Sequence, residues 1–210
     1  MLKPIQIYEL LKKEYPGAKI SLDFENPLQL LVATILSAQC TDARVNVVTK
    51  PLFKRYKTAT DYAEGDIDEL KAYIRSTGFY NAKAKHIQEA CRILLQDFDG
   101  KVPETMEDLL TLPGVARKTA NVVLSNAYGK NYGIAVDTHM IRLNYRMGFT
   151  KEKSPEKIEK DLMAVLPKNL WNKYTYYILE HGRNVCKAPT PVCSKCVLKN
   201  CPRQGVTIFK

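Results

Sequence analysis

The 210-residue sequence lacks a long hydrophobic run. Its longest apolar stretch, residues 28–36, spans nine residues and includes Gln29 and Thr34, whereas a membrane-spanning helix needs about 18 to 20 apolar residues. The first residues also lack the apolar region and the small-residue cleavage site of a secretory signal. We therefore expect a cytoplasmic protein with no membrane partner.

Internal repeats, low-complexity segments and β-strand patterns are also missing. Apolar residues make up 45% of the chain and charged residues 26%, which excludes disordered and collagen-like classes. The only strand-like run, residues 133–136, is too short to build a sheet. The sequence therefore predicts an all-α fold with a packed core.

Apolar residues instead recur at helical spacing, in segments bounded by capping residues, proline or glycine. Asn26 followed by Pro27 predicts the start of a buried central helix, and Asp66 with Glu69 predicts a capping box. The helix that begins at Asp42 is expected to break near Pro51. The predicted helices cover residues 5–14, 28–36, 42–56, 66–75, 81–98, 105–111, 117–128, 138–147, 154–166 and 171–180.

The charge of the chain is strongly positive and unevenly distributed. Lysine and arginine number 32 against 22 aspartates and glutamates, a net charge of +10. Residues 151–210 carry twelve basic and five acidic side chains, whereas residues 21–150 carry 16 and 15. Such an excess favours a polyanionic partner, although a lysine-coated soluble surface explains the charge equally well without a motif beside it.

Four of the six cysteines lie within sixteen residues in a C-x6-C-x2-C-x4-C pattern. Disulfides are disfavoured in a cytoplasmic chain, so metal or cofactor ligation is the better interpretation. One C-x2-C pair with longer arms favours a 4Fe-4S cluster, with a structural zinc site as the alternative. The expected ligands are Cys186, Cys193, Cys196 and Cys201, whereas Cys40 and Cys91 are predicted to be small buried core residues.

Lysines alternate with these cysteines, at Lys187, Lys195 and Lys199. A single lysine on a surface loop is ordinarily there for solubility. Three lysines around a rigid four-ligand knot predict a platform for phosphate groups.

The segment Leu112–Asn121 resembles the helix-hairpin-helix motif of DNA-binding proteins. Gly114 allows a backbone conformation that brings main-chain N–H groups close to a ligand, and the following helix N-terminus adds further donors. We expect Leu112, Gly114 and Ala116 to contact DNA phosphates without reading bases. Ala116 stands at a position that is often glycine in this motif.

Nineteen residues after Lys118, Asp137 follows the apolar run of residues 134–136 and precedes a predicted helix. Taken alone, Asp137 is an ordinary helix N-cap. The order of hairpin, Val-Asp-Thr-His and four-cysteine cluster over the whole chain, however, resembles the endonuclease III family of base-excision-repair enzymes. Further matching segments are Leu36–Asp42, Gly78–Ala84 and His181–Arg183.

This resemblance implies a catalytic role for two residues. Lys118 matches the family nucleophile, whose amine displaces the damaged base from the sugar C1′ and forms a Schiff base that permits β-elimination. Asp137 matches the family aspartate, which stabilises the cationic sugar. Gln39 and Phe79 match the residues that fill the space left by the extruded nucleotide, and Phe79 replaces a frequent leucine.

The resemblance also implies the organisation and the partners of the protein. It predicts a six-helix domain over residues 20–130 and a cluster domain made of residues 1–19 and 131–210. It implies a 4Fe-4S cluster, although four residues rather than the family's usual five separate Cys196 from Cys201. The expected partner is double-stranded DNA that contains either a damaged base, namely an oxidised pyrimidine, or an abasic site. The protein is expected to bind it as a monomer. It is expected to act in the cytoplasm of a prokaryote, in association with the nucleoid. Lys195 and Lys199 are the expected basic contacts.

Two alternatives come from other functional classes. A non-catalytic DNA-binding module would keep the hairpin and the cysteine cluster but would have no use for Lys118 and Asp137 together. An electron-transfer protein would use the cluster itself, but it would need neither ten helices nor a net charge of +10.

Overall fold

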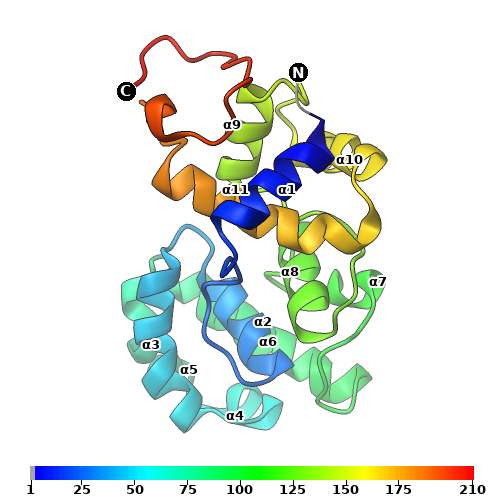
Figure 1. The fold of residues 1–210 in the computed structure, drawn as a ribbon. Helices are drawn as coiled ribbons and strands as arrows, with labels where there is room; N and C mark the ends of the chain where they lie inside the picture. The colour runs from blue at the N-terminus through cyan, green and yellow to red at the C-terminus, as the bar shows by residue number, and fades with distance from the viewer. Residues whose placement is uncertain (1–2) are drawn as a thin grey trace. The chain divides into compact units, whose positions relative to one another are not determined.

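The computed structural model describes residues 3–210, and within that range it contains helices and connecting segments but no β-strand (Figure 1). The predicted all-α class is therefore confirmed. The chain divides into two compact units. Unit 1 joins the N-terminal residues up to Ile20 with Gly133–Lys210, and unit 2 is Ser21–Tyr132. In the described part of the chain, no helix is long and apolar enough to cross a membrane.

Unit 2 is built around α2, Pro27–Leu36, a helix that is apolar on nearly every side. Three other helices of the unit, α3, α6 and α8, pack against it. All residues from Leu30 to Leu36 are buried, because neighbours cover every face of this helix. The other elements of unit 2 are α3 (Asp42–Arg55), α4 (Ala59–Glu64), α5 (Ile67–Ile74), the 3-10 helix η1 (Arg75–Thr77), α6 (Tyr80–Asp97), α7 (Met106–Leu109) and α8 (Arg117–Ala127).

The start of α2 follows the predicted capping pattern. The backbone N–H of Gln29 donates to Asn26 Oδ1 at 3.0 Å, and Pro27 occupies the first helical position, where its missing N–H costs nothing. Thr41 caps α3 and Thr105 caps α7 in the same way. The local sequence therefore determines where these helices begin.

The predicted break near Pro51 is wrong, because α3 continues through this residue to Arg55. The proline deprives the carbonyl of Val47 of its helical partner, and Val47 is 59% exposed, on the solvent side of the helix. Burial of Val48 and Leu52 on the opposite side of the helix offsets the lost hydrogen bond.

The predicted capping box at Asp66 is also wrong. Asp66 caps α5 by accepting from the backbone N–H of Asp68 at 2.7 Å, but Glu69 turns away and forms a bidentate pair with Arg55 at 2.8 and 2.9 Å. A reciprocal capping box stands instead at Thr58 and Asp61, at the start of α4, a helix that our sequence reasoning missed. Its sequence signature, Thr-x-x-Asp, was present to be found.

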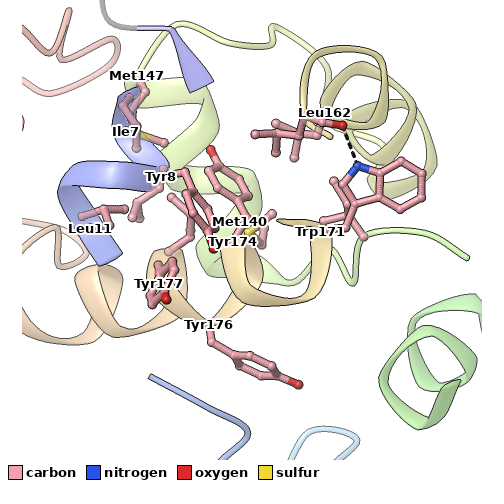
Figure 2. Close-up of a cluster of buried hydrophobic side chains, with 14 of the residues drawn as sticks. Ile7, Tyr8, Leu11, Met140, Met147, Leu162, Trp171, Tyr174, Tyr176 and Tyr177 are labelled. Atoms are coloured by element: carbon pink, nitrogen blue, oxygen red, sulfur yellow. Dashed lines mark hydrogen bonds between the residues drawn. The ribbon is translucent and has the colours of Figure 1, made fainter. Parts of the chain in front are cut away.

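Unit 1 has a separate hydrophobic core (Figure 2). Its helices are α1 (Pro4–Glu14), α9 (Thr138–Arg146), α10 (Pro155–Val165) and α11 (Trp171–Asn184), with the 3-10 helices η2 (Lys168–Leu170) and η3 (Cys193–Lys195). Both α1 and α9 pack on α11. The prediction ended α11 four residues too early, at Glu180.

Aromatic side chains of α11 form the centre of this core. Tyr174 is fully buried, and its hydroxyl donates to Asn144 Oδ1 at 2.7 Å. Tyr8 of α1 meets Tyr177 edge-to-face, with ring centroids 5.3 Å apart. The Trp171 indole N–H donates to the carbonyl of Leu166 at 2.9 Å, the dashed line in Figure 2. The contact between Tyr8 and Tyr177 holds the N-terminal helix against α11, although the two segments are far apart in sequence.

Candidate functional site

The turn between α7 and α8 has the geometry that the hairpin motif requires. Gly114 is exposed and has φ +78°, a backbone conformation in which a side chain is strained. A Cβ added at Gly114 would lie 3.0 Å from Cβ of His86 on α6, so space is restricted as well. Leu112, by contrast, is only 2% exposed, and its backbone N–H and carbonyl are bonded within the turn, to Leu109 at 3.2 Å and to Val115 at 3.1 Å.

The N-terminus of α8 follows this turn directly. Ala116 is the N-cap with φ −89°, so its Cβ causes no strain, and it provides no side-chain acceptor for the first N–H groups of the helix. Lys118 is the second residue of α8, and its side chain is exposed. The turn therefore places backbone N–H groups of a helix N-terminus and one lysine amine on a short stretch of chain.

Gln39 and Phe79 share an unusual backbone conformation. Gln39 has φ 53° and lies in the turn after α2, while Phe79 has φ 48° and is the N-cap of α6. Both side chains are exposed, and Phe79 is 67% exposed despite its size. A positive φ in a non-glycine residue and a large apolar side chain in solvent are each uncommon, and they cluster at functional positions.

Asp137 lies in unit 1 as the N-cap of α9. Its Oδ1 accepts from the backbone N–H of Met140 at 2.8 Å, and its Oδ2 lies 3.4 Å from Nδ1 of His139. The side chain remains 21% exposed, so solvent reaches the carboxylate. Asp137 therefore caps α9 through Oδ1, while Oδ2 takes no part in the cap.

The four clustered cysteines line one cavity in unit 1. None of them forms a disulfide, and each is partly exposed. Burial raises the pKa of Cys196 and of Cys201, and the neighbouring thiols act in the same direction. The predicted ligands Cys186, Cys193, Cys196 and Cys201 are therefore brought together around a shared space.

The guanidinium of Arg146 on α9 forms hydrogen bonds with the loop that begins at Cys186. This arginine is only 8% exposed, and its guanidinium donates to Cys186 Sγ at 3.4 Å and to the carbonyl of Lys187 at 2.8 Å. Its second nitrogen donates to the carbonyl of Pro189 at 3.2 Å. A buried cation in this position favours negative charge on the neighbouring sulfur.

His181 of α11 contacts the cavity from another side. Its Nε2 lies 3.4 Å from Cys196 Sγ, and its Nδ1 lies 3.1 Å from the hydroxyl of Tyr15. Burial lowers the pKa of His181 to about 4, so the ring is neutral, and burial raises the pKa of Tyr15 to about 12. With Tyr15 donating to Nδ1, the ring N–H at Nε2 points at the sulfur.

Our sequence reasoning did not single out Arg146 or Tyr15, and it used His181 only as part of a matching segment. Arg146 carries no local signal, since a basic residue near a helix end is ordinary. Lys195 and Lys199 are exposed as expected, and Lys199 lines the rim of the cysteine cavity.

The two other cysteines have different environments. Cys91 is 1% exposed inside unit 2, as predicted, and burial raises the pKa of its thiol to about 12. Cys40 is only partly buried, so its prediction as a core residue is wrong. It lies beyond the C-terminus of α2, in the turn that follows Gln39, where α2 no longer carries it into the core.

Comparison with known proteins places these features in a family. The profile of the HhH-GPD superfamily of base excision DNA repair proteins matches residues 32–168. Endonuclease III of Synechocystis sp. is 56% identical over 198 residues, which cover 94% of this chain and 90% of that protein. The chain belongs to the endonuclease III family. Endonuclease III of Escherichia coli is 39% identical over 198 residues, covering 94% of this chain and 93% of that protein.

Solved structures of the endonuclease III family extend the match to three dimensions. A trapped endonuclease III–DNA covalent intermediate has a TM-score of 0.90 at 44% identity, covering 97% of both chains. A non-covalent endonuclease III–DNA complex matches equally well. A thermostable thymine-DNA glycosylase, at 22% identity and a TM-score of 0.80, shares the fold. The protein is therefore a DNA-binding, base-excision glycosylase with lyase activity.

Proposed function

We propose that this enzyme removes oxidised pyrimidines from duplex DNA and cleaves the strand, with Lys118 as its nucleophile. The observation that carries the proposal is the exposed side chain of Lys118, the second residue of α8, four residues after the positive-φ turn at Gly114. A covalent endonuclease III–DNA intermediate has been trapped in a related protein. A covalent intermediate needs a nucleophile, and an amine is the side chain that forms a Schiff base with a sugar aldehyde.

The reaction consists of base displacement, Schiff-base formation, β-elimination and hydrolysis. The lone pair of Lys118 Nζ attacks C1′, and the bond between C1′ and the base breaks, so the base leaves with the electron pair. Loss of the amine proton and opening of the sugar ring give a C1′=N Schiff base, and the ring oxygen gains a proton. Removal of a C2′ proton then drives cleavage of the C3′–O bond, which releases the 3′ phosphate. Water hydrolyses the Schiff base and restores Lys118.

Asp137 stabilises positive charge on the sugar as the base departs. The hydrogen bond from Met140 fixes one carboxylate oxygen, so the orientation of the charge is set before the reaction. The remaining oxygen is the one near His139. We assign no catalytic step to His139.

The hairpin binds the DNA backbone, and the two loops that carry Gln39 and Phe79 contact the base stack. Backbone N–H groups around Gly114 and Ala116 bind phosphate and recognise no base. The buried Leu112 supports this turn, since its carbonyl accepts from the N–H of Val115 at 3.1 Å. Gln39 and Phe79 enter the stack and occupy the space of the extruded nucleotide, which must leave the helix before Lys118 reaches C1′. Their exposure and strained backbones support this assignment.

The four cysteines are proposed to hold a 4Fe-4S cluster. They surround one cavity, with an arginine and a histidine N–H directed at the sulfurs. When bound, the cluster cross-links the loops between Cys186 and Cys201 into a rigid unit.

Metal analysis provides a direct check of this assignment. The purified protein is expected to be brown, with iron and sulfide in near-equal amounts, and Cys196→Ser is expected to lose most of the iron and to melt at lower temperature. Cys40→Ser is the matched control and should keep its iron, because Cys40 lies in the other unit. A colourless, stably folded protein with one zinc ion would contradict the proposal.

Lys195 and Lys199 are proposed to meet DNA phosphates from the cysteine loops. For about four to six neutralised phosphates, the plot of log affinity for undamaged duplex against log salt concentration should have a slope of roughly −4 to −5. Replacing both lysines with alanine should flatten the slope by about one to two and leave lesion preference unchanged. Replacing Lys12 and Lys13 of α1 instead controls for net charge, and an equal flattening there would argue against a specific contact.

The lesion class is tested with a panel of duplexes that carry thymine glycol, uracil, 8-oxoguanine or an abasic site, each incubated with borohydride. We expect a trapped adduct with thymine glycol and with the abasic site, and at least about tenfold less with the other two lesions. Release of uracil without an adduct would overturn both the substrate class and the amine mechanism.

The organisation of the protein completes the proposal. We propose that unit 2 is the domain predicted for residues 20–130, with seven α-helices, α2 to α8, in place of the predicted six, and that unit 1 is the cluster domain. We further propose a monomer that acts in the cytoplasm, in keeping with its bacterial relatives. Large exposed apolar side chains in the described chain are spread over several elements, which supports the monomer. Examples are Val47, Phe79, Leu110, Val165 and Ile208.

A further inference from the structure

Lys83 is a buried lysine that the proposed chemistry does not use. It lies in the first turn of α6 and is only 4% exposed. Its Nζ donates to the carbonyl of Leu36 at 2.8 Å and to the carbonyl of Thr77 at 2.8 Å. Burial lowers its pKa below the ordinary value. An ammonium group is costly to bury, so a lysine in this position needs a reason.

The two acceptors are the last residues of two helical elements. Leu36 ends α2, and Thr77 ends η1. Terminal carbonyls have no partner within their own helix and carry the negative end of its dipole, so they are suited to a cationic donor. One side chain thus joins segments that lie 47 and six residues away in the sequence.

Each of these carbonyls stands two or three residues before one of the two exposed residues with a positive φ. Leu36 precedes Gln39 by three residues, and Thr77 precedes Phe79 by two. The backbone of Lys83 also donates to the carbonyl of Phe79, at 3.1 Å. Both loops turn through a positive φ within three residues of the anchored carbonyl, at Gln39 and at Phe79.

We infer that Lys83 is a positioning residue that ties the Gln39 loop to the Phe79 loop, so that both side chains enter the DNA stack together. This inference rests on the proposed role of Gln39 and Phe79 in filling the vacated space. Lys83 acts through the two loops, and it touches neither the reacting sugar nor the base.

Loss of Lys83 should slow base release only from substrates in which the damaged base must first leave a stable stack. Lys83→Met keeps the apolar stem of the side chain and removes both hydrogen bonds. It is expected to slow single-turnover release of thymine glycol from a paired duplex by about tenfold or more, the scale of a misplaced positioning group. Release from a lesion inside a short mismatched bubble should stay within about twofold, because that nucleotide is already unstacked.

Gln88→Met is the matched control on the same helix. Gln88 is also buried, and its Nε2 donates to the carbonyls of Gly65 at 2.9 Å and Tyr62 at 3.4 Å, away from both loops. It should change the two rates equally or not at all. Equal slowing of both substrates by Lys83→Met, or the same selective slowing by Gln88→Met, would overturn the inference. If Lys83→Met folds poorly, Lys83→Gln, which keeps a polar group but is too short to reach both carbonyls, is expected to show the same selectivity.

A double-mutant cycle separates this inference from the function on which it rests. In a background that carries both Gln39→Ala and Phe79→Ala, Lys83→Met should slow duplex release by less than about twofold, because the two residues it positions are gone. Full additivity would overturn the positioning role alone. If Phe79→Ala and Gln39→Ala leave duplex release unchanged, the proposed filling of the stack fails, and the inference fails with it.

Discussion

Lys118→Gln is expected to abolish the borohydride-trapped protein–DNA adduct and to lower strand cleavage at an abasic site by about 10⁴-fold or more, the scale of removing a covalent nucleophile. A glutamine amide has no lone pair able to attack C1′, so neither the Schiff base nor the elimination that depends on it can form. Gel analysis of borohydride-treated reactions measures the adduct, and single-turnover cleavage measures the rate.

Binding separates a chemical defect from a structural one. Lys118 is exposed on α8, so its replacement should change the free energy of unfolding by less than about 0.5 kcal/mol. Affinity for abasic duplex should remain within about threefold, because the backbone donors of the hairpin are untouched. Lys101→Gln, at another exposed lysine of unit 2, should behave as the unmodified protein. Efficient trapping by Lys118→Gln would show that another amine performs the reaction.

Asp137→Asn is expected to reduce base removal by about 100-fold or more while leaving the fold intact. Asparagine preserves the oxygen that accepts from Met140, so the cap on α9 survives and stability should fall by less than about 1 kcal/mol. The lost negative charge no longer stabilises the cationic sugar, at the cost typical of removing one preorganised electrostatic group. Glycosylase rates on thymine glycol, measured together with thermal unfolding, report the two effects separately.

Asp66→Asn provides the matched control for capping. Asp66 is also an N-cap aspartate, and its carboxylate accepts from the backbone N–H of Asp68 at 2.7 Å, on an exposed surface of unit 2. Its replacement should have a similarly small effect on stability and none on the rate. Near-normal activity of Asp137→Asn, or an equal rate loss in Asp66→Asn, would reduce Asp137 to a helix cap.

The sequence by itself determined the fold class, the starts of the capped helices and the grouping of the four cysteines. These features depend on neighbours in the chain. The Asn26-Pro27 pair acts within one turn of α2, and apolar spacing is a property of each helix alone. The cysteines fall within sixteen residues, so short loops suffice to bring them around one cavity. The catalytic roles proposed for Lys118 and Asp137 came from the order of the motifs along the chain and from the family resemblance.

Long-range contacts decided what the sequence did not reveal. Pro51 stays inside α3 because buried neighbours outweigh the lost hydrogen bond, and Glu69 leaves its expected cap because Arg55 offers a stronger partner. Lys83 reads as an ordinary helical lysine, yet it joins carbonyls from two other elements, and Arg146 reaches Cys186 from 40 residues away. Such partners are chosen by burial, since a buried polar group binds whatever acceptor the folded chain brings near it.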